Sequence, residues 1–216
     1  MTKPSDRSKI VRSPNRAHYD AESLNKVLDD GYLCHVAYDY MGSPVIIPTA
    51  FAREDDVVYI HGAIKNRMMN SLLDQGKATV SVTHMDGMVL ARSAFHHSFN
   101  YRSAVIFGKP FKVEFQDEKN RILELITENI IPGRWEEVRQ PTPKELDITL
   151  VIGIRIQEAS VKMRAGSPVD DDADYDLPIW AGEFPVKLTY NHPVVDDAGK
   201  QGLEVPESVK SILRNQ

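Results

Sequence analysis

Residues 32–61 read YLCHVAYDYMGSPVIIPTAFAREDDVVYIH and contain three runs rich in β-branched and aromatic residues. Polar turns at 40–43 and 54–56 separate the runs. Connections this short join antiparallel neighbours. We therefore predict that the strands at 32–39, 44–53 and 57–61 form an antiparallel meander.

Helical periodicity flanks this segment on both sides. Before it, Asp20 is placed to cap a short helix over 21–30, which Gly31 ends. After it, residues 64–75 place apolar side chains at helical spacing, and Gly76 ends the pattern. A longer amphipathic helix is predicted over 117–131. A capping box at Thr142 and Glu145 predicts a further short helix.

Strand patterns return in the second half of the chain. We expect strands at 77–84 and 88–95 joined by a tight turn at 85–87, and a strand at 148–156. The run 101–115 is interrupted at Gly108 and Pro110, which predicts a bulge or an edge position, because proline cannot donate to a sheet ladder. Six or more short strands with a few helices predict a mainly β fold, a closed antiparallel barrel.

The two ends of the chain differ from this central region. Residues 1–19 are polar and are expected to form an extended arm, ahead of a barrel domain at 20–163. Residues 165–177 are rich in aspartate and are expected to form a solvated loop. Apolar residues return at 178–190, and a last helix is predicted at 206–213. Residues 164–216 are therefore interpreted as a C-terminal extension that packs on the barrel or on a dimer partner.

Composition excludes several classes of protein. The 216 residues include 31 acidic and 26 basic ones, giving a formal charge of −5, so a dedicated nucleic-acid binder is not expected. The single cysteine, Cys34, lies in an apolar strand and is expected to be a buried thiol. The sequence has neither an apolar run of about 18 residues nor a secretory signal. We expect a cytoplasmic protein without a membrane partner.

Common catalytic and metal-binding motifs are missing from the sequence. The histidines are scattered except for His96 and His97, and adjacent residues of a strand point to opposite faces. No metal site is predicted, and the catalytic residues stay unassigned.

The segment 59–67, YIHGAIKNR, is the most informative stretch for ligand binding. A strand ends at His61, small residues follow at Gly62 and Ala63, and a helix begins just beyond. Free amides at a helix N-terminus suit a phosphate, and Lys65 and Arg67 add positive charge. The alternative is that both cations are solvated residues of the first helical turn.

Two further clusters could line a ligand site. Tyr101, Arg102 and Ser103 open a long strand, where Tyr101 and Ser103 share one face and Arg102 points the other way. They could line a polar pocket or form a barrel rim. Trp180 could be a core anchor, an aromatic wall for a planar ligand or part of a subunit interface.

In this order, the segments YIHGAIKNR, FNYRSAVIFGKP, RWEEVRQPTPKEL, ASVKMRAG and IWAGEFP resemble the pyridoxamine 5'-phosphate oxidase-like proteins. The resemblance is to their flavin-nucleotide-binding branch, which includes the nitroimidazole-resistance proteins, and it runs from about Arg12 to Val186. It implies a split β-barrel of six or seven strands in Greek-key order that dimerises and holds FMN between the subunits.

The resemblance also implies which residues contact FMN. The ring would lie along the strand with Pro48, Thr49, Ala50 and Phe51. The phosphate would be held by the segment with His61, Gly62, Ala63, Lys65, Asn66 and Arg67, with Tyr101, Arg102 and Ser103 near the ring edge and Trp180 reaching across the dimer. Asn66 stands where related sequences often have glycine. The Arg/His-rich C-terminus of true pyridoxamine 5'-phosphate oxidases is missing, so that substrate is not expected.

Our leading hypothesis is an FMN-dependent oxidoreductase acting on a small molecule, with Arg102 and Lys162 as candidates for stabilising reduced flavin. The alternatives are a non-catalytic flavin carrier or sensor, and a haem protein of the same fold with His61, His96 or His97 as axial ligand. A purely structural interaction protein, colourless when purified, is the remaining possibility.

Overall fold

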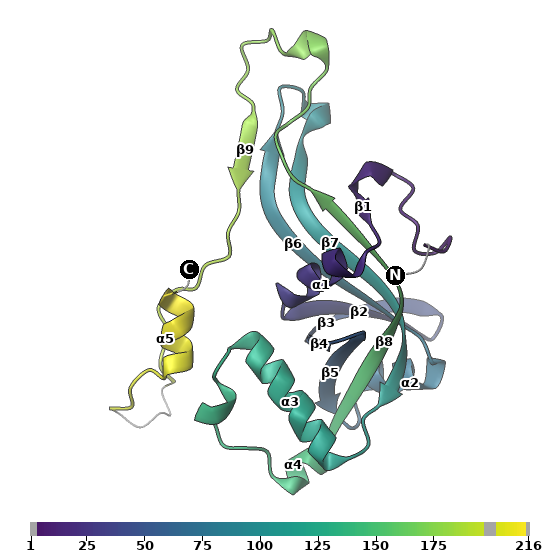
Figure 1. Ribbon diagram of the computed structural model, residues 1–216, viewed down its shortest axis with the longest axis vertical. Coiled ribbons are helices and arrows are strands. Elements are labelled where there is room, and N and C mark those ends of the chain that lie inside the picture. The colour runs from purple at the N-terminus through teal and green to yellow at the C-terminus, as the bar shows by residue number, and fades with distance from the viewer. Residues whose placement is uncertain (1–3, 197–201, 215–216) are drawn as a thin grey trace.

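A single antiparallel sheet of nine strands dominates the computed structural model, which describes residues 4–196 and 202–214 (Figure 1). The predicted mainly β class is thus confirmed. The strands are β1 (Ala17–His18), β2 (Leu33–Tyr40), β3 (Ser43–Ala50), β4 (Ala52–Glu54), β5 (Val57–Ala63), β6 (Ala78–Leu90), β7 (Ser98–Lys112), β8 (Thr149–Arg164) and β9 (Gly182–Pro185). The α-helices are α1 (Ala21–Asp29), α2 (Arg67–Gln75), α3 (Gln116–Ile130), α4 (Pro143–Asp147) and α5 (Glu207–Arg214).

The strand order is β3-β2-β6-β7-β8-β5-β4, with β1 added beside β8 and β9 beside β6. The curved sheet encloses the main core, to which α1 and α2 contribute buried side chains. A second, smaller apolar cluster lies under α3. The arrangement is that of a split barrel, but the sheet does not close, and it has more strands than the six or seven expected.

The predicted three-strand meander is confirmed in its first half and only in part in its second. β2 and β3 pair along their whole length, but of the predicted strand 44–53 only Ala52 and Arg53, in β4, pair with β5, which pairs with β8 on its other side. The cause is Phe51, whose side chain is completely buried and breaks the extended run between β3 and β4. Asp55, with φ of 51°, then makes the tight turn that sends the chain back as β5.

Asn129 fixes this corner from α3. Its Nδ2 donates to the carbonyl oxygens of Gly31 (3.0 Å) and Phe51 (2.9 Å). We expect Asn129→Ala to lower the free energy of unfolding by about 1–3 kcal/mol, because two partly buried carbonyls lose their donor. Urea denaturation checks this, with the exposed Gln116→Ala as control. Equal stability of both variants would contradict it.

The tight turn expected at 85–87 is a β-bulge inside one continuous strand, β6. Met85 pairs with Tyr101 and Gly87 with Asn100, so Asp86 is the extra residue. Gly87 is needed because β9 passes close by, and a Cβ there would lie 3.2 Å from the carbonyl oxygen of Phe184. The turn was mispredicted because β9, the strand that uses this site, is distant in sequence.

The sequence predicted a bulge or an edge position at Gly108 and Pro110, and the structure shows a bulge at the first and an unpaired edge at the second. In the β7–β8 ladder Phe107 pairs with Glu158 and Gly108 with Ile156, which leaves Gln157 as the extra residue of a bulge. Pro110 lies beyond the last residue that β7 pairs with β6, so its missing N–H costs no ladder bond on that side.

Local helix signals in the sequence are confirmed. Asp20 accepts a hydrogen bond from the Ser23 amide at 2.7 Å and caps α1. Thr142 and Glu145 form the expected capping box of α4. α3 buries Ile122 and Ile126 as its periodicity predicted. Among the described residues, no helix is long and apolar enough to span a bilayer.

The segments outside the sheet are more tightly held than their composition indicates. Arg7 of the N-terminal arm forms an ion pair with Glu158 and stacks on Phe107 at 4.5 Å. Asp170, expected in a solvated loop, has a buried side chain that accepts hydrogen bonds from the Arg92 and Ser93 amides. The buried Asp170 carboxylate therefore docks the acidic loop by satisfying backbone donors just beyond β6, and Asp171 adds an ion pair with His96.

The C-terminal extension contacts the helices beside the barrel. Tyr190 and Tyr32 share a hydrogen bond between their hydroxyls at 3.0 Å. At the start of α5, the Ser208 amide donates to Glu137 at 3.0 Å. These contacts place the extension beside α3 and the short 3-10 helix Trp135–Glu137.

Candidate functional site

The junction between β5 and α2 has the geometry of an anion site. Asn66 caps α2 by accepting a hydrogen bond from the Met69 amide at 3.1 Å. The first amides of a helix have no partner within the helix, and they carry its positive dipole end. Lys65 and Arg67 are exposed on either side of the cap. Two cations therefore flank free amides at one point.

Gly62 allows the helix cap to approach the strand. A Cβ at this position would lie 2.9 Å from the Met69 sulfur and 3.1 Å from Nδ2 of Asn66. The small residue noted in the sequence is thus required by packing. Asn66, which departs from the glycine of related sequences, serves as the N-cap and adopts extended backbone angles that any residue can take.

Arg67 is oriented by two tyrosines of β2. Its Nε donates to the Tyr38 hydroxyl at 3.2 Å, and its guanidinium lies 4.3 Å from the centre of the Tyr40 ring. The hydrogen bond that Arg67 donates to Tyr38 raises the pKa of Arg67 above its ordinary value. Arg67 is therefore a fixed cation, whereas Lys65 has no hydrogen bond or ion pair within the described residues.

His61 and Ala63 end β5 at the same place, where both are exposed. Although the His61 ring reaches the surface, desolvation by its surroundings lowers its pKa. The junction therefore carries an uncharged imidazole beside its two cations at neutral pH.

The strand with Pro48, Thr49 and Ala50 is the end strand of the sheet path. β3 pairs with β2 on one side, and among the described residues no strand pairs with its other edge. Backbone groups on such an edge are free to bind a ligand. Phe51 differs from its neighbours because its side chain is in the core, its amide donates to the Tyr32 carbonyl and its own carbonyl accepts from Asn129.

The outer face of the sheet carries residues of β3 together with Tyr101 and Ser103 of β7. The register aligns Pro48, His35, Ser81, Val105 and Ser160 in one row across five strands. Alternation along β7 places Ser103 and Tyr101 on the same face as Val105.

Arg102 points to the opposite face, as predicted from alternation. Its guanidinium forms ion pairs with Asp86 (3.0 Å) and with Asp30 at the end of α1. The hydrogen bonds that Arg102 donates to Asp86 and Asp30 raise its pKa. Lys162, opposite Ser103, donates instead to the Arg12 carbonyl at 3.0 Å. Arg102 is therefore separated from the face that carries Tyr101 and Ser103.

Trp180 lies far along the chain from these groups, just before β9. Its side chain is 68% exposed.

Cys34 is buried, as the sequence analysis expected, and burial raises the pKa of its thiol to about 12. No group of three or more potential metal ligands occurs in the parts of the chain that the structure describes.

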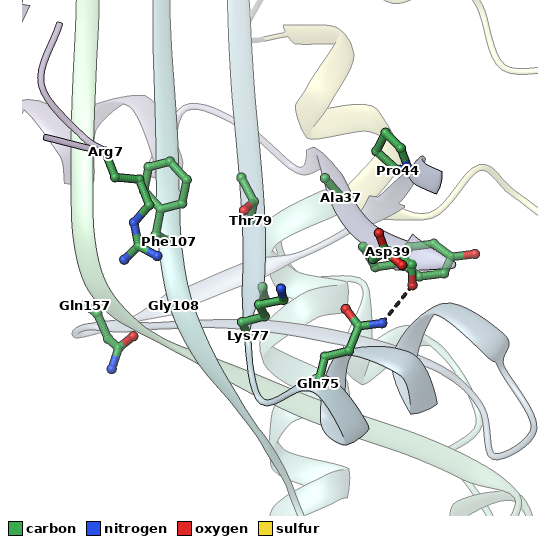
Figure 2. A pocket seen from close by; sticks show the side chains of 12 residues that line it. Arg7, Ala37, Asp39, Pro44, Gln75, Lys77, Thr79, Phe107, Gly108 and Gln157 are labelled. Carbon is green, nitrogen blue, oxygen red and sulfur yellow. Dashed lines mark hydrogen bonds between the residues drawn. The ribbon is translucent and has the colours of Figure 1, made fainter. Parts of the chain in front are cut away.

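A separate hollow of about 240 Å³ opens between the N-terminal arm and the end of α2 (Figure 2). Figure 2 shows Arg7 against Phe107 on one side and Gln75 bonded to the Asp39 carbonyl on the other. None of the predicted ligand residues lines it. Its charges are mixed, since Arg7 faces Glu158 and Lys77 shares the hollow with Asp39, so it has no preference for a phosphate.

The sequence analysis missed the two tyrosines that hold Arg67. Tyr38 and Tyr40 lie in the quoted strand segment, but nothing in their spacing relates them to a helix that begins at residue 67. Two small residues, a helix start and two cations within nine residues were enough to propose an anion site, because those groups are local in sequence.

Comparisons with known proteins agree with this fold. The Azotobacter vinelandii protein described as flavocytochrome Anf3 is 35% identical, with a TM-score of 0.90 and 97% of each chain covered. A Mycobacterium smegmatis protein described as binding FAD and heme is 36% identical, with a TM-score of 0.86, covering 91% of this chain and 97% of that one.

A putative 5-nitroimidazole antibiotic resistance protein from Bacteroides thetaiotaomicron shares the fold, at 18% identity and a TM-score of 0.58, over 68% of this chain and 85% of that one. No curated protein matches the sequence. The family model described as pyridoxamine 5'-phosphate oxidase matches residues 20–163. The chain belongs to the pyridoxamine 5'-phosphate oxidase family, as the resemblance read from its sequence indicated.

Proposed function

We propose that this protein binds a flavin nucleotide, FMN in the simplest case, and acts as a flavin-dependent oxidoreductase on a small molecule. The observation that carries the proposal is the junction of β5 and α2, where Lys65, Arg67 and free helix amides converge beside Gly62. The two relatives matched over nearly the whole chain are described as a flavocytochrome and as a protein that binds FAD and heme.

The residues of the site fit a flavin in size and chemistry. The phosphate would bind at Lys65, Arg67 and the first amides of α2, and the ring would lie against the free edge of β3 at Pro48–Ala50. Both regions adjoin β2, on which His35 and Tyr38 are about 10 Å apart along the strand. When bound, the flavin would supply the electron-transfer chemistry, and the protein would bind and orient it.

An absorption spectrum of the purified protein, followed by mass analysis of the released nucleotide, tests this proposal. We expect bands of oxidised flavin, and the mass separates FMN from FAD. A colourless protein that takes up neither nucleotide would overturn it. Turnover with NAD(P)H and a panel of acceptors then separates an oxidoreductase from a flavin carrier, which would bind flavin without turnover.

A homodimer is part of the proposal. β3 exposes Ile46, which is 62% accessible, and the neighbouring turn exposes Met41 at 88%. Apolar side chains concentrated on one face mark a binding surface. We expect a dimer by light scattering and a shift towards monomer with Ile46→Glu, because a charge cannot be buried unpaired. A monomeric wild-type protein at micromolar concentration would contradict this.

Haem binding is a second proposed function, because one near-full-length relative is described as binding FAD and heme and the other as a flavocytochrome. The protein would then hold two redox groups, with flavin in the family domain. Reconstitution with haemin tests this: a Soret band with one haem per chain is expected. Haemin that stays unbound while flavin binds would contradict haem binding and leave the flavin proposal intact.

A further inference from the structure

The face of the sheet formed by β9, β6 and β7 beyond the barrel body is apolar and uncovered in the described chain. Met88 pairs with Phe99 on one side and with Phe184 on the other, so these three side chains share one face. Phe99 is 53% exposed and Phe184 59%. Figure 1 shows this part of β6 and β7 rising away from the helices, with β9 alongside.

Trp180 extends the same face. Leu90 pairs with Gly182, and the missing Cβ of Gly182 would point to the side on which Met88 and Phe184 lie. A Cβ there would be 3.0 Å from Cζ2 of Trp180, so the indole covers the space that glycine leaves. Trp180, Phe184, Met88 and Phe99 form what we call the aromatic platform.

The opposite face of these strands is packed only near the end of β6, where Val89 is fully buried and Ala91 nearly so. Further along, it opens into a hollow of about 390 Å³ that Asn100, Arg102 and Glu183 help to line. The aromatic platform differs from this polar hollow because it offers planar apolar side chains.

His97 immediately precedes β7, two residues before Phe99, and one hydrogen bond orients its imidazole. Nδ1 is 3.0 Å from the Ser93 carbonyl oxygen. Because a carbonyl oxygen only accepts, Nδ1 carries the proton, and Nε2 keeps its lone pair. Nε2 has no hydrogen-bond partner in residues 4–196 and 202–214. Histidines that ligate metals are typically fixed in this way.

Two other histidines are excluded by their contacts. Nε2 of His84 lies 2.9 Å from the Val27 carbonyl oxygen, and Nε2 of His96 lies 3.4 Å from the Asp171 carboxylate. Their outer ring nitrogen is already used. His61 belongs to the junction at which we place the flavin phosphate.

A relay of hydrogen bonds sets the position of His97. The buried Asp170 carboxylate accepts the Ser93 amide at 3.1 Å, and the Ser93 carbonyl receives Nδ1–H of His97. Asp170 is therefore a positioning residue for the imidazole. This explains why one aspartate of an otherwise exposed loop is buried.

We infer that haem binds on the aromatic platform with His97 as an axial ligand and that Asp170 orients His97 through Ser93. The inference rests on the haem-binding function proposed above. A planar macrocycle matches the aromatic surface, and the free Nε2 supplies a ligand for its iron. The match to the Azotobacter flavocytochrome covers 97% of this chain and so extends beyond residue 163, where the family domain ends and the segment with Trp180 follows.

Haemin titration of the full-length protein tests this inference when variants of the adjacent residues His96 and His97 are compared. We expect His97→Ala to lose the Soret band of the wild type, with imidazole added to His97→Gly restoring it. His96→Ala should keep the band, since its Nε2 faces Asp171. Bound flavin should be unchanged in all variants, which shows that they fold. A wild-type spectrum in His97→Ala would overturn the assignment, as would loss of the band only in His61→Ala.

The platform and the relay each have their own test. Trp180→Ala should weaken haemin binding, whereas Leu188→Ala, equally exposed at 68% but outside the platform, should not. Asp170→Asn should shift the Soret and electron paramagnetic resonance signals at unchanged flavin content.

If Trp180→Ala converts a dimer to a monomer and leaves haemin affinity intact, the platform is an interface between copies and the inference fails. If wild-type protein binds flavin but no haemin, both the haem function and this inference fail, and the flavin proposal stands.

Discussion

Replacing Lys65 and Arg67 together with alanine is expected to weaken FMN binding by roughly a hundredfold or more. Each cation would make a charge-assisted hydrogen bond with the phosphate, worth about 1.5–3 kcal/mol, and two such losses correspond to at least that factor. Quenching of flavin fluorescence during titration measures the affinity. Because the sites are exposed, we also expect wild-type affinity to fall as salt is raised.

Riboflavin provides the matched control for this prediction, since it has the ring and ribityl chain of FMN but no phosphate. The double variant should bind riboflavin as well as the wild-type protein does. Lys77→Ala, in the separate hollow with Arg7, should leave FMN affinity unchanged. If the double variant lost riboflavin and FMN equally, the phosphate would not be held by these cations.

Truncating Phe51 to alanine is expected to cost about 3–5 kcal/mol of unfolding free energy. Its side chain is completely buried in the main core at the corner between β3 and β4, so the change leaves a cavity where the end strand turns. Urea denaturation measures the loss. Phe99→Ala, on the exposed platform, should change stability by about 0.5 kcal/mol or less. Similar values for the two variants would contradict the assignment of Phe51 to the core.

Local features of this fold could be predicted from the sequence because each depends on residues close together. The Asp20 cap and the Thr142 capping box need only a few neighbouring residues to form. The proposed anion site is also local, since Gly62, Asn66 and Arg67 lie within one strand end and one helical turn.

Features that depend on distant partners could not be predicted. β5 pairs with β8, almost a hundred residues away, in addition to the neighbouring β4, and nothing near β5 in the sequence indicates this partner. The bulge at Asp86 lies where β9 pairs with β6, and the buried Asp170 accepts the Arg92 amide just beyond β6. Alternation did place Arg102 on the face opposite Tyr101, but its partners Asp30 and Asp86 come from separate elements.

A crystal structure of the protein loaded with FMN is the most direct test of the central claim. We expect the phosphate within hydrogen-bonding distance of Lys65 and the first amides of α2, with the ring against the free edge of β3. A phosphate bound elsewhere, for example between Arg7 and Lys77 in the separate hollow, would contradict it.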